Sequence, residues 1–269
     1  MAIYDCFQYF NEDHIADLRF NILNDFVDKF VIVESTVNHQ GKIKKLHFDI
    51  NKYKKFKDKI EYIVVDDTPE NIKKPHEGGE SLVEQHQRNS IIKGLKNCRE
   101  EDLVILSDVD EIPDLTKLYQ FNKKNKYAVF SQRAFAYKLN LFNKGEDNWH
   151  GSKMCLKKNL KSPQWLRNLK FKKYPFWRID KPRNLQIIEN GGWHFAYLLD
   201  SEGISKKIKS FAHGEDNKKD NTDIDKIKGK MKKLLHPTKG FELTKVKIDK
   251  TFPKYILDNL SHYDEWIAK

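Results

Sequence analysis

Residues 103–113 read LVILSDVDEIP, an unbroken apolar run that ends in a group of carboxylates and then in a proline. The apolar residues 103–106 show neither alternation nor helical spacing, which is typical of a strand covered on both faces, as in an α/β sheet. Ligands of such sheets bind beyond the carboxyl ends of the strands, where these carboxylates fall. The segment therefore predicts a buried strand that delivers acidic side chains to a binding edge.

Asp108, Asp110 and Glu111 lie close together in the sequence, so their charges repel one another unless a cation neutralises them. Carboxylate oxygens favour Mg2+ or Mn2+, and these ions usually keep open positions that a substrate diphosphate fills. We predict a divalent-metal site built on Asp108 and Asp110, with Glu111 orienting its neighbours. The alternative is an acidic turn that ends at Pro113.

The flanking sequence alternates strand-like and helix-like segments, which predicts an α/β fold with a mostly parallel central sheet flanked by helices. Strands are expected at residues 3–10, 29–34, 60–65 and 103–106, and helices at residues 13–25, 51–59 and 80–98. Two further strands are expected in the aromatic stretch 127–142, and surface helices and loops in the charged stretch 214–250.

The 269 residues are expected to form one domain. We divide it into a nucleotide-binding half, residues 1–113, and an acceptor-side half, residues 114–269, whose carboxyl-terminal helices are rich in lysine. The apolar faces of sugars stack on aromatic rings, so tryptophans of the second half are candidate sugar-binding residues. These are Trp149, Trp165, Trp177 and Trp193. Most aromatic residues of this half are nevertheless expected in the core.

The formal net charge is +11, yet the sequence does not favour a nucleic-acid-binding protein. The basic residues are mostly lysines interleaved with acids, and arginine, which suits base edges and bidentate phosphate contacts, is scarce. We therefore expect a solvated lysine surface and no nucleic-acid partner. Its positive potential would attract a nucleotide diphosphate or an anionic membrane surface.

Cys6, Cys98 and Cys155 are an odd number of widely spaced cysteines without the spacing of a metal site. They are expected to be reduced thiols in a reducing compartment. No apolar stretch is long enough to span a membrane, and no secretory leader precedes the first expected strand. We expect a soluble, cytoplasmic protein without a transmembrane segment.

A second motif, NGGWHF at residues 190–195, is followed by Ser201 and Glu202. Paired glycines allow the backbone to approach a ligand closely, and Ser201 is suited to cap a helix that begins near Glu202. A carboxylate in the first turn of a helix is placed to accept a proton from a sugar hydroxyl. The alternative is that Glu202 only favours the start of the helix.

Two further residues carry suitable chemistry for a metal or phosphate site. His213, in SFAHGE, can ligate a metal or contact a phosphate, although a single histidine is more often a structural hydrogen-bonding residue. Arg88, in QRN on the helix before the acidic strand, can pair with a diphosphate, with Glu34 or with the acids themselves.

Taken together, these segments resemble glycosyltransferase family 17, in the same order from about residue 3 to beyond residue 213. They are DCFQYFNE (5–12), VDKFVIVEST (27–36), QRN (87–89), LVILSDVDEIP (103–113) and GGWHF (191–195). The resemblance implies a GT-A nucleotide-sugar-binding fold, a UDP-sugar donor and a divalent ion held by a DxD motif. It also implies an inverting reaction, in which an α-linked donor yields a β-linked product.

The same resemblance implies a set of site residues. Those expected to bind the donor are Glu34, Arg88, Asp108, Gly191, Gly192, Trp193 and His194. The expected metal ligands are Asp108, Asp110 and His213, and the expected catalytic base is Glu202. We expect metal-dependent transfer of a sugar, GlcNAc first, from a UDP-sugar to a hydroxyl of an oligosaccharide or glycan. Because the membrane anchor of the animal members is missing, we expect a bacterial or viral glycan rather than a Golgi N-glycan.

Two other classes stay open at this point. A two-metal phosphohydrolase or nucleotidyltransferase also gathers acids at strand ends but needs a second carboxylate cluster, for which Asp66 and Asp67 are the adjacent candidates. A basic polyanion-binding module would bind in a salt-sensitive manner that does not depend on Asp110. The sequence does not indicate an oligomeric state.

Overall fold

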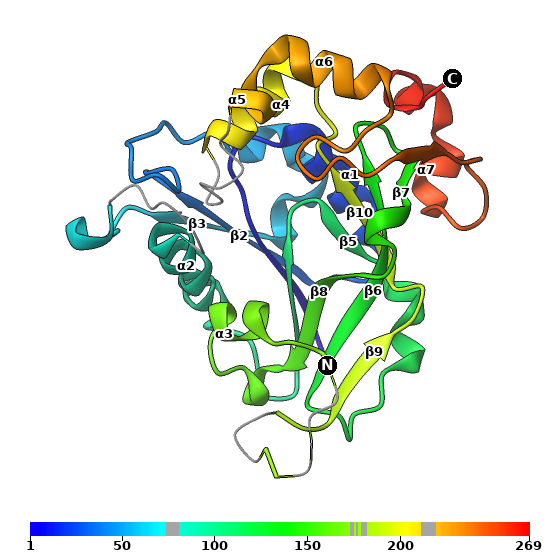
Figure 1. Ribbon diagram of the computed structural model, residues 1–269. Coiled ribbons are helices and arrows are strands. Elements are labelled where there is room, and N and C mark those ends of the chain that lie inside the picture. The colour runs from blue at the N-terminus through cyan, green and yellow to red at the C-terminus, as the bar shows by residue number, and fades with distance from the viewer. Residues whose placement is uncertain (74–80, 173–174, 176, 179–181, 211–218) are drawn as a thin grey trace.

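The computed structural model describes residues 1–269 except 74–80, 173–174, 176, 179–181 and 211–218 (Figure 1). Its strands are β1 Ile3–Gln8, β2 Lys29–Ser35, β3 Ile60–Val65, β4 Leu103–Asp108, β5 Glu111–Pro113, β6 Tyr127–Ala136, β7 Leu141–Asn143, β8 Trp149–Leu156, β9 Leu185–Ile188, β10 Gly192–Ala196 and β11 Leu243–Lys245. Its α-helices are α1 Asp13–Leu23, α2 Leu82–Asn89, α3 Pro163–Asn168, α4 Ser201–Ser210, α5 Lys219–Thr222, α6 Ile224–Lys232 and α7 Lys254–Asp258. Short 3-10 helices are η1 Ile50–Lys59, η2 Glu70–Ile72, η3 Ser90–Leu95, η4 Leu115–Gln120, η5 Lys144–Glu146, η6 Lys157–Asn159 and η8 Leu260–Trp266.

One sheet joins the two halves of the described chain, in the strand order β11-β7-β6-β8-β4-β1-β2-β3. Strands β3, β2, β1 and β4 are parallel to one another, whereas β8 is antiparallel to both β4 and β6. Strand β10 lies between β5 and β6. The predicted α/β fold with a helix-flanked central sheet is confirmed. Its parallel pairing is concentrated in the first half, because β7, β8 and β11 of the second half run antiparallel to their neighbours.

Strand β4 is buried on both faces, as its unbroken apolar sequence predicts. Ile105 packs into the core cluster that α1 and η1 cover, while Val104 and Leu106 join the cluster on the opposite face, under η3 and α3. Figure 1 shows α2 and α3 beside the strands, and α4, α5 and α6 gathered above their ends. The acids that follow β4 are therefore presented at an edge of the sheet and not on a covered face.

The carboxyl ends of the parallel strands meet at this edge. Gln8, the last residue of β1, lies opposite Asp108, the last residue of β4, and it also pairs with Val33 of β2. The loops that follow β1, β2 and β4 therefore converge, which is the arrangement that creates ligand sites in α/β sheets.

Two expected helices differ from the prediction. The segment expected to be helical at residues 80–98 divides into α2, which the side chain of Ser81 caps, and the tighter η3. The lysine-rich segment at residues 51–59 forms η1, which a non-helical residue, Tyr53, interrupts. Within η1 only Tyr53 and Phe56 are buried, so two aromatic anchors and not an apolar helix face position this segment.

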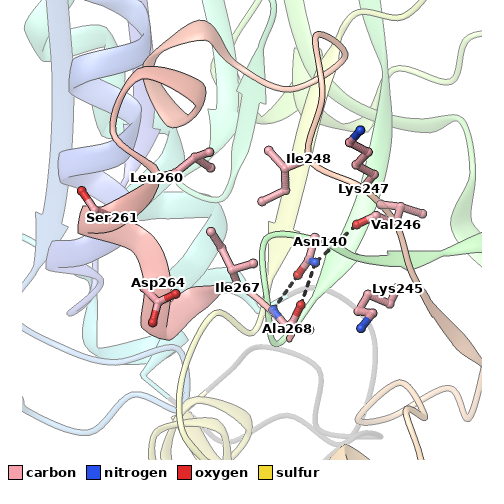
Figure 2. A pocket seen from close by; sticks show the side chains of 10 residues that line it. All are labelled: Asn140, Lys245, Val246, Lys247, Ile248, Leu260, Ser261, Asp264, Ile267 and Ala268. Atoms are coloured by element: carbon pink, nitrogen blue, oxygen red, sulfur yellow. Dashed lines mark hydrogen bonds between the residues drawn. The ribbon is translucent and has the colours of Figure 1, made fainter.

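The carboxyl terminus is fixed to the sheet by Asn140. The side-chain oxygen of Asn140 accepts the backbone N–H of Ala268 at 2.7 Å, and its amide nitrogen donates to the carbonyls of Ala268 at 3.1 Å and Val246 at 3.3 Å. These contacts border a cavity of about 540 Å3 between residues 245–248 and η8 (Figure 2). Its apolar lining also includes Ile248, Leu260 and Ile267.

The three cysteines are buried and form no disulfide. Burial raises the pKa of Cys98 to about 11 and that of Cys155 to about 12, so both are protonated and unreactive thiols at neutral pH. Within the described ranges, no helix combines the length and the apolar character that crossing a bilayer requires.

Candidate active site

A pocket of about 510 Å3 lies at the edge where the parallel strands end; we call it the strand-edge pocket. Three parts of the chain line it. The loop after β1 and the neighbouring segments contribute Gln8, Glu12, His39 and Gln87, and the motif after β4 contributes Asp108 and Asp110. The opposite wall, which we call the far wall, contributes Glu146, Trp149, His194, Lys207 and His236. The predicted acids thus lie in a pocket whose lining combines polar side chains with aromatic rings, Tyr9 and Phe10 next to Gln8 and Trp149 stacked on His194.

Arg19 of α1 fixes the backbone of the acidic motif. Its Nη1 donates to the carbonyl oxygens of Asp108 and Val109, both at 3.3 Å, and to that of Glu111 at 2.6 Å. The same guanidinium forms an ion pair with Asp5 of β1 at 2.6 Å, and both side chains are fully buried. One arginine therefore ties a helix and a strand to the loop that carries Asp108 and Asp110.

Glu111 organises the same loop from its other side. Its buried carboxylate accepts the backbone N–H of Asp108 at 3.0 Å and the indole N–H of Trp149 at 2.8 Å, and it lies 3.3 Å from Arg167 of α3. Because it contacts three neighbours and does not line the pocket, Glu111 holds the position of Asp108 and Trp149.

Asp108 is held by two arginines. Its carboxylate lies 2.6 Å from Arg167 and 3.6 Å from Arg88, and its side chain keeps 37% of its surface exposed. Burial would raise the pKa of Asp108, but the two arginines outweigh it and hold the pKa below its ordinary value. Arg88 also pairs with Glu84 and donates to Gln164 at 2.6 Å. The sequence left three partners open for Arg88, a diphosphate, Glu34 or the acids. In the structure it contacts one of the acids, Asp108.

Asp110 is paired with a lysine that the sequence did not single out. The ammonium of Lys207, on α4, lies 3.1 Å from Oδ2 of Asp110, and Nε2 of His194 lies 3.8 Å from Oδ1. Burial would raise the pKa of Asp110, but Lys207 and His194 lower it overall. Burial opposes the charge of Lys207, yet Asp110 and Glu12 raise the pKa of Lys207 above its ordinary value, so the pair is ionised.

His194 and Trp149 form the aromatic side of the pocket. Their rings stack with centroids 4.8 Å apart and planes inclined by 23°. Among the described residues, Nδ1 of His194 is a buried polar atom without a hydrogen-bond partner. An orphaned ring nitrogen beside a stacked indole suits a ligand that offers both a polar group and an apolar face.

Gly191, Gly192 and Trp193 contact protein and do not line the strand-edge pocket. A Cβ on Gly192, whose φ is +136°, would lie 2.2 Å from the carbonyl of Ile112, and one on Gly191 would lie 2.9 Å from Cα of Phe130. Trp193 is buried and donates its indole N–H to the carbonyl of Thr251 at 2.9 Å. The paired glycines allow β10 to pass between β5 and β6, and the next residue, His194, is the one that reaches the pocket.

The remaining predicted residues lie in three different places. Glu34 is fully buried in β2, where its carboxylate accepts the backbone N–H groups of His47 and Phe48 and the hydroxyl of Tyr62. Glu202 is in the first turn of α4, as predicted, and is exposed. His213 lies outside the described residues.

The far wall of the pocket contains a charged group that the sequence did not indicate. Glu146 pairs with Lys239 and lies 3.8 Å from Nε2 of His236. Burial lowers the pKa of His236 to about 4, so the ring is neutral at physiological pH. Its Nδ1 accepts the backbone N–H groups of Thr238 and Lys239, which fixes this loop beside Glu146.

The oxygen ligands available in the pocket are of the type that a divalent ion prefers. Asp108 and Asp110 offer hard carboxylate oxygens, although within the described part of the chain no cluster of three or more His, Cys, Asp or Glu side chains is arranged to hold an ion. The protein ligands here would be these two carboxylates, with diphosphate and water completing the shell. Asp67, a candidate for a second cluster, pairs with Lys93 at 2.7 Å and His86 at 3.1 Å, away from the strand-edge pocket.

Comparison with known proteins now defines the class. The sequence matches the family model of glycosyltransferase family 17 over residues 1–235, a span that contains the parallel strands, the acidic motif, β10 and α4. The chain belongs to glycosyltransferase family 17.

Known proteins similar to the chain include a human transferase and a structure of S. aureus TarS. The human protein "Beta-1,4-mannosyl-glycoprotein 4-beta-N-acetylglucosaminyltransferase" shares 21% identity over an alignment of 285 positions, which covers 94% of this chain and 52% of the human protein. The chain thus spans about half the length of this relative. The crystal structure of S. aureus TarS 1-349 has a TM-score of 0.30 and 13% identity, covering 50% of this chain and 36% of that chain.

Proposed function

We propose that the protein transfers a sugar, GlcNAc as first expectation, from a UDP-sugar to a hydroxyl of an oligosaccharide or glycan, with inversion at the anomeric carbon and dependence on Mn2+ or Mg2+. The observation that carries this proposal is that Asp108 and Asp110 line one pocket together with the stacked rings of Trp149 and His194. Membership of family 17 supports glycosyl transfer, and the name of the human relative supports GlcNAc as the sugar.

The lining of the pocket offers groups for both parts of a nucleotide sugar. On one side of the acids, Phe10 offers a ring and the amide oxygen of Gln8 a hydrogen-bond acceptor for the nucleoside, while the amide nitrogen of Gln8 donates to the carbonyl of Glu84. On the other side, the rings of Trp149 and His194 offer an apolar surface for the sugar, and Nδ1 of His194 needs a polar partner. The diphosphate would then lie at Asp108 and Asp110.

Different residues of this chain would have different roles in an in-line displacement. A divalent ion bound at Asp108 and Asp110 would supply positive charge against the departing UDP. Arg167 and Arg88 keep Asp108 ionised and in place, and Arg19 fixes the loop beneath both acids. We retain Glu202 as the proposed base, which would remove the proton of the acceptor hydroxyl as that hydroxyl attacks the anomeric carbon.

A donor-hydrolysis screen tests the proposed donor. With Mn2+ and no acceptor, we expect slow release of UDP from a UDP-sugar, UDP-GlcNAc first, because water can replace the acceptor hydroxyl. UDP-glucose, UDP-galactose and nucleotide sugars with other bases are tested in parallel by a coupled assay for the released nucleotide. Cleavage confined to donors with another base would contradict the UDP assignment, and an undiminished rate in EDTA would contradict the metal dependence.

The variant Glu202→Gln tests the proposed base. We expect transfer to fall by about 100- to 10,000-fold, while UDP binding measured by calorimetry stays the same. Glu146→Gln is the comparison, because Glu146 is the carboxylate of the far wall and its side chain is only 9% exposed. A large loss in Glu146→Gln with normal turnover in Glu202→Gln would move the role of base to Glu146. Parallel loss of transfer and UDP binding in Glu202→Gln would assign Glu202 to donor binding.

A further inference from the structure

Lys207 is a buried cation at the centre of the strand-edge pocket. Its side chain is only 9% exposed, and its ammonium lies 3.1 Å from Asp110 and 3.7 Å from Glu12. Lysines are rarely buried unless they are paired, and most lysines of α4 follow this rule by facing solvent, as Lys206 and Lys209 do. The buried lysine is therefore placed at one of the two carboxylates proposed to hold the metal.

We propose that Lys207 is a resident counter-ion of Asp110 and that a divalent ion has to displace its ammonium in order to bind. This inference rests on the proposed metal site. An ammonium 3.1 Å from Oδ2 occupies the space that a cation on this oxygen would take. The two positive charges would also repel each other strongly at such a distance, because the side chains of Lys207 and Asp110 are only 9% and 14% exposed.

The structure offers the displaced ammonium a second carboxylate. Oε2 of Glu12 accepts the backbone N–H groups of Phe10 at 3.1 Å and Asn11 at 3.0 Å, so the position of this carboxylate is fixed. Its other oxygen, Oε1, faces Lys207 at 3.7 Å. A small rotation of the flexible lysine side chain would therefore exchange Asp110 for Glu12 without leaving the charge unpaired.

The two arginines that pair with Asp108 differ from Lys207 in their chemistry and in the contacts that hold them. Arg167 contacts Asp108 and Glu111 together, and Arg88 contacts Glu84 and Gln164 as well as Asp108. Each of these guanidinium groups has several partners in a planar arrangement, so neither can leave Asp108 without breaking other contacts. The ammonium of Lys207 sits on a flexible side chain and can move between Asp110 and Glu12, so we infer that it is the exchangeable cation of the acidic motif.

Binding of Mn2+ to the full chain without nucleotide tests the inference. Electron paramagnetic resonance measures free Mn2+ in titrations of the wild type, Lys207→Met, Lys209→Met and Asp110→Asn. We expect Lys207→Met to bind Mn2+ at least about tenfold more tightly than the wild type, because the competing charge is gone. Lys209→Met, which changes an exposed lysine of the same helix, is expected to match the wild type.

The outcomes separate this inference from the proposed function. Unchanged or weaker Mn2+ binding in Lys207→Met, with binding lost in Asp110→Asn, would overturn the role of Lys207 and leave the metal site standing. Mn2+ binding in Asp110→Asn equal to that of the wild type would overturn the metal site, and the role of Lys207 with it.

A second measurement needs no lysine variant and covers the case in which Lys207→Met does not fold. Hydrogen exchange of α4 in the wild type is compared without and with saturating Mn2+. We expect faster exchange in α4 with Mn2+, because Lys207 then keeps Glu12 and no longer ties the helix to the acidic motif. Bound Mn2+ with unchanged exchange in α4 would overturn the inference.

Discussion

The variant Arg19→Met is expected to lower the free energy of unfolding by about 3 to 5 kcal/mol, the range typical of a buried ion pair that loses one partner. Asp5 would be left fully buried without its counter-ion, and the carbonyls of Asp108, Val109 and Glu111 would lose a donor. Urea denaturation followed by circular dichroism measures the change.

The matched control for Arg19→Met is Lys254→Met, which breaks an ion pair with Asp258 on the surface of α7. Exposed pairs contribute little, so we expect a loss below about 1 kcal/mol there. The double variant Asp5→Leu with Arg19→Met should recover part of the stability, since no buried charge remains. A loss in Arg19→Met as small as in the control would show that Arg19 does not hold the acidic motif.

The variant Asp110→Asn is expected to reduce sugar transfer by about 100- to 1000-fold, the scale on which removing a single electrostatic group from an active site acts. Asparagine has the same shape but cannot neutralise a divalent ion. The fold should remain, because Lys207 keeps Glu12 as a partner at 3.7 Å. Steady-state transfer assays and a thermal melt measure the two effects separately.

Asp66→Asn is the control for the change at Asp110, since Asp66 is an exposed acid that does not line the strand-edge pocket. It should transfer sugar at the rate of the wild type. If Asp110→Asn kept most of the activity while its thermal melt was unchanged, the central position of Asp110 in the reaction would be wrong.

The acidic strand could be predicted from the sequence because the residues that determine it are adjacent in the chain. The apolar residues 103–106 and the acids that follow them determine the burial of β4 and the position of Asp108 at the sheet edge. The four parallel strands follow from the same kind of pattern. Short-range sequence therefore predicts where the site lies.

The counter-ions of the acids could not be predicted in the same way, because they come from distant parts of the chain. Arg167 is 59 positions from Asp108, and Lys207 is 97 positions from Asp110. Lys207 also looks like any other lysine in a sequence with 50 basic residues. Arg19 did carry a signal, since it lies four residues after Ile15 on the apolar face of α1 and would need a buried partner there.

The paired glycines show a different limit. Two adjacent glycines indicate that other atoms pack closely against this backbone, but they do not indicate whether those atoms belong to the protein or to a ligand. In the structure the atoms close to these glycines are the carbonyl of Ile112 and the backbone of Phe130, which belong to the protein. Of the GGWHF residues predicted to bind the donor, His194 lines the strand-edge pocket, and the role of every predicted site residue stays a prediction.

The direction of β1 decides how the molecule can be attached to a support. Met1 precedes the amino end of β1, and the strand-edge pocket lies beyond its carboxyl end, roughly 20 Å away for a strand of this length. A tether at the amino terminus would therefore hold the molecule by the side opposite the pocket mouth. An immobilised array made in this way would leave the pocket open to large molecules in solution.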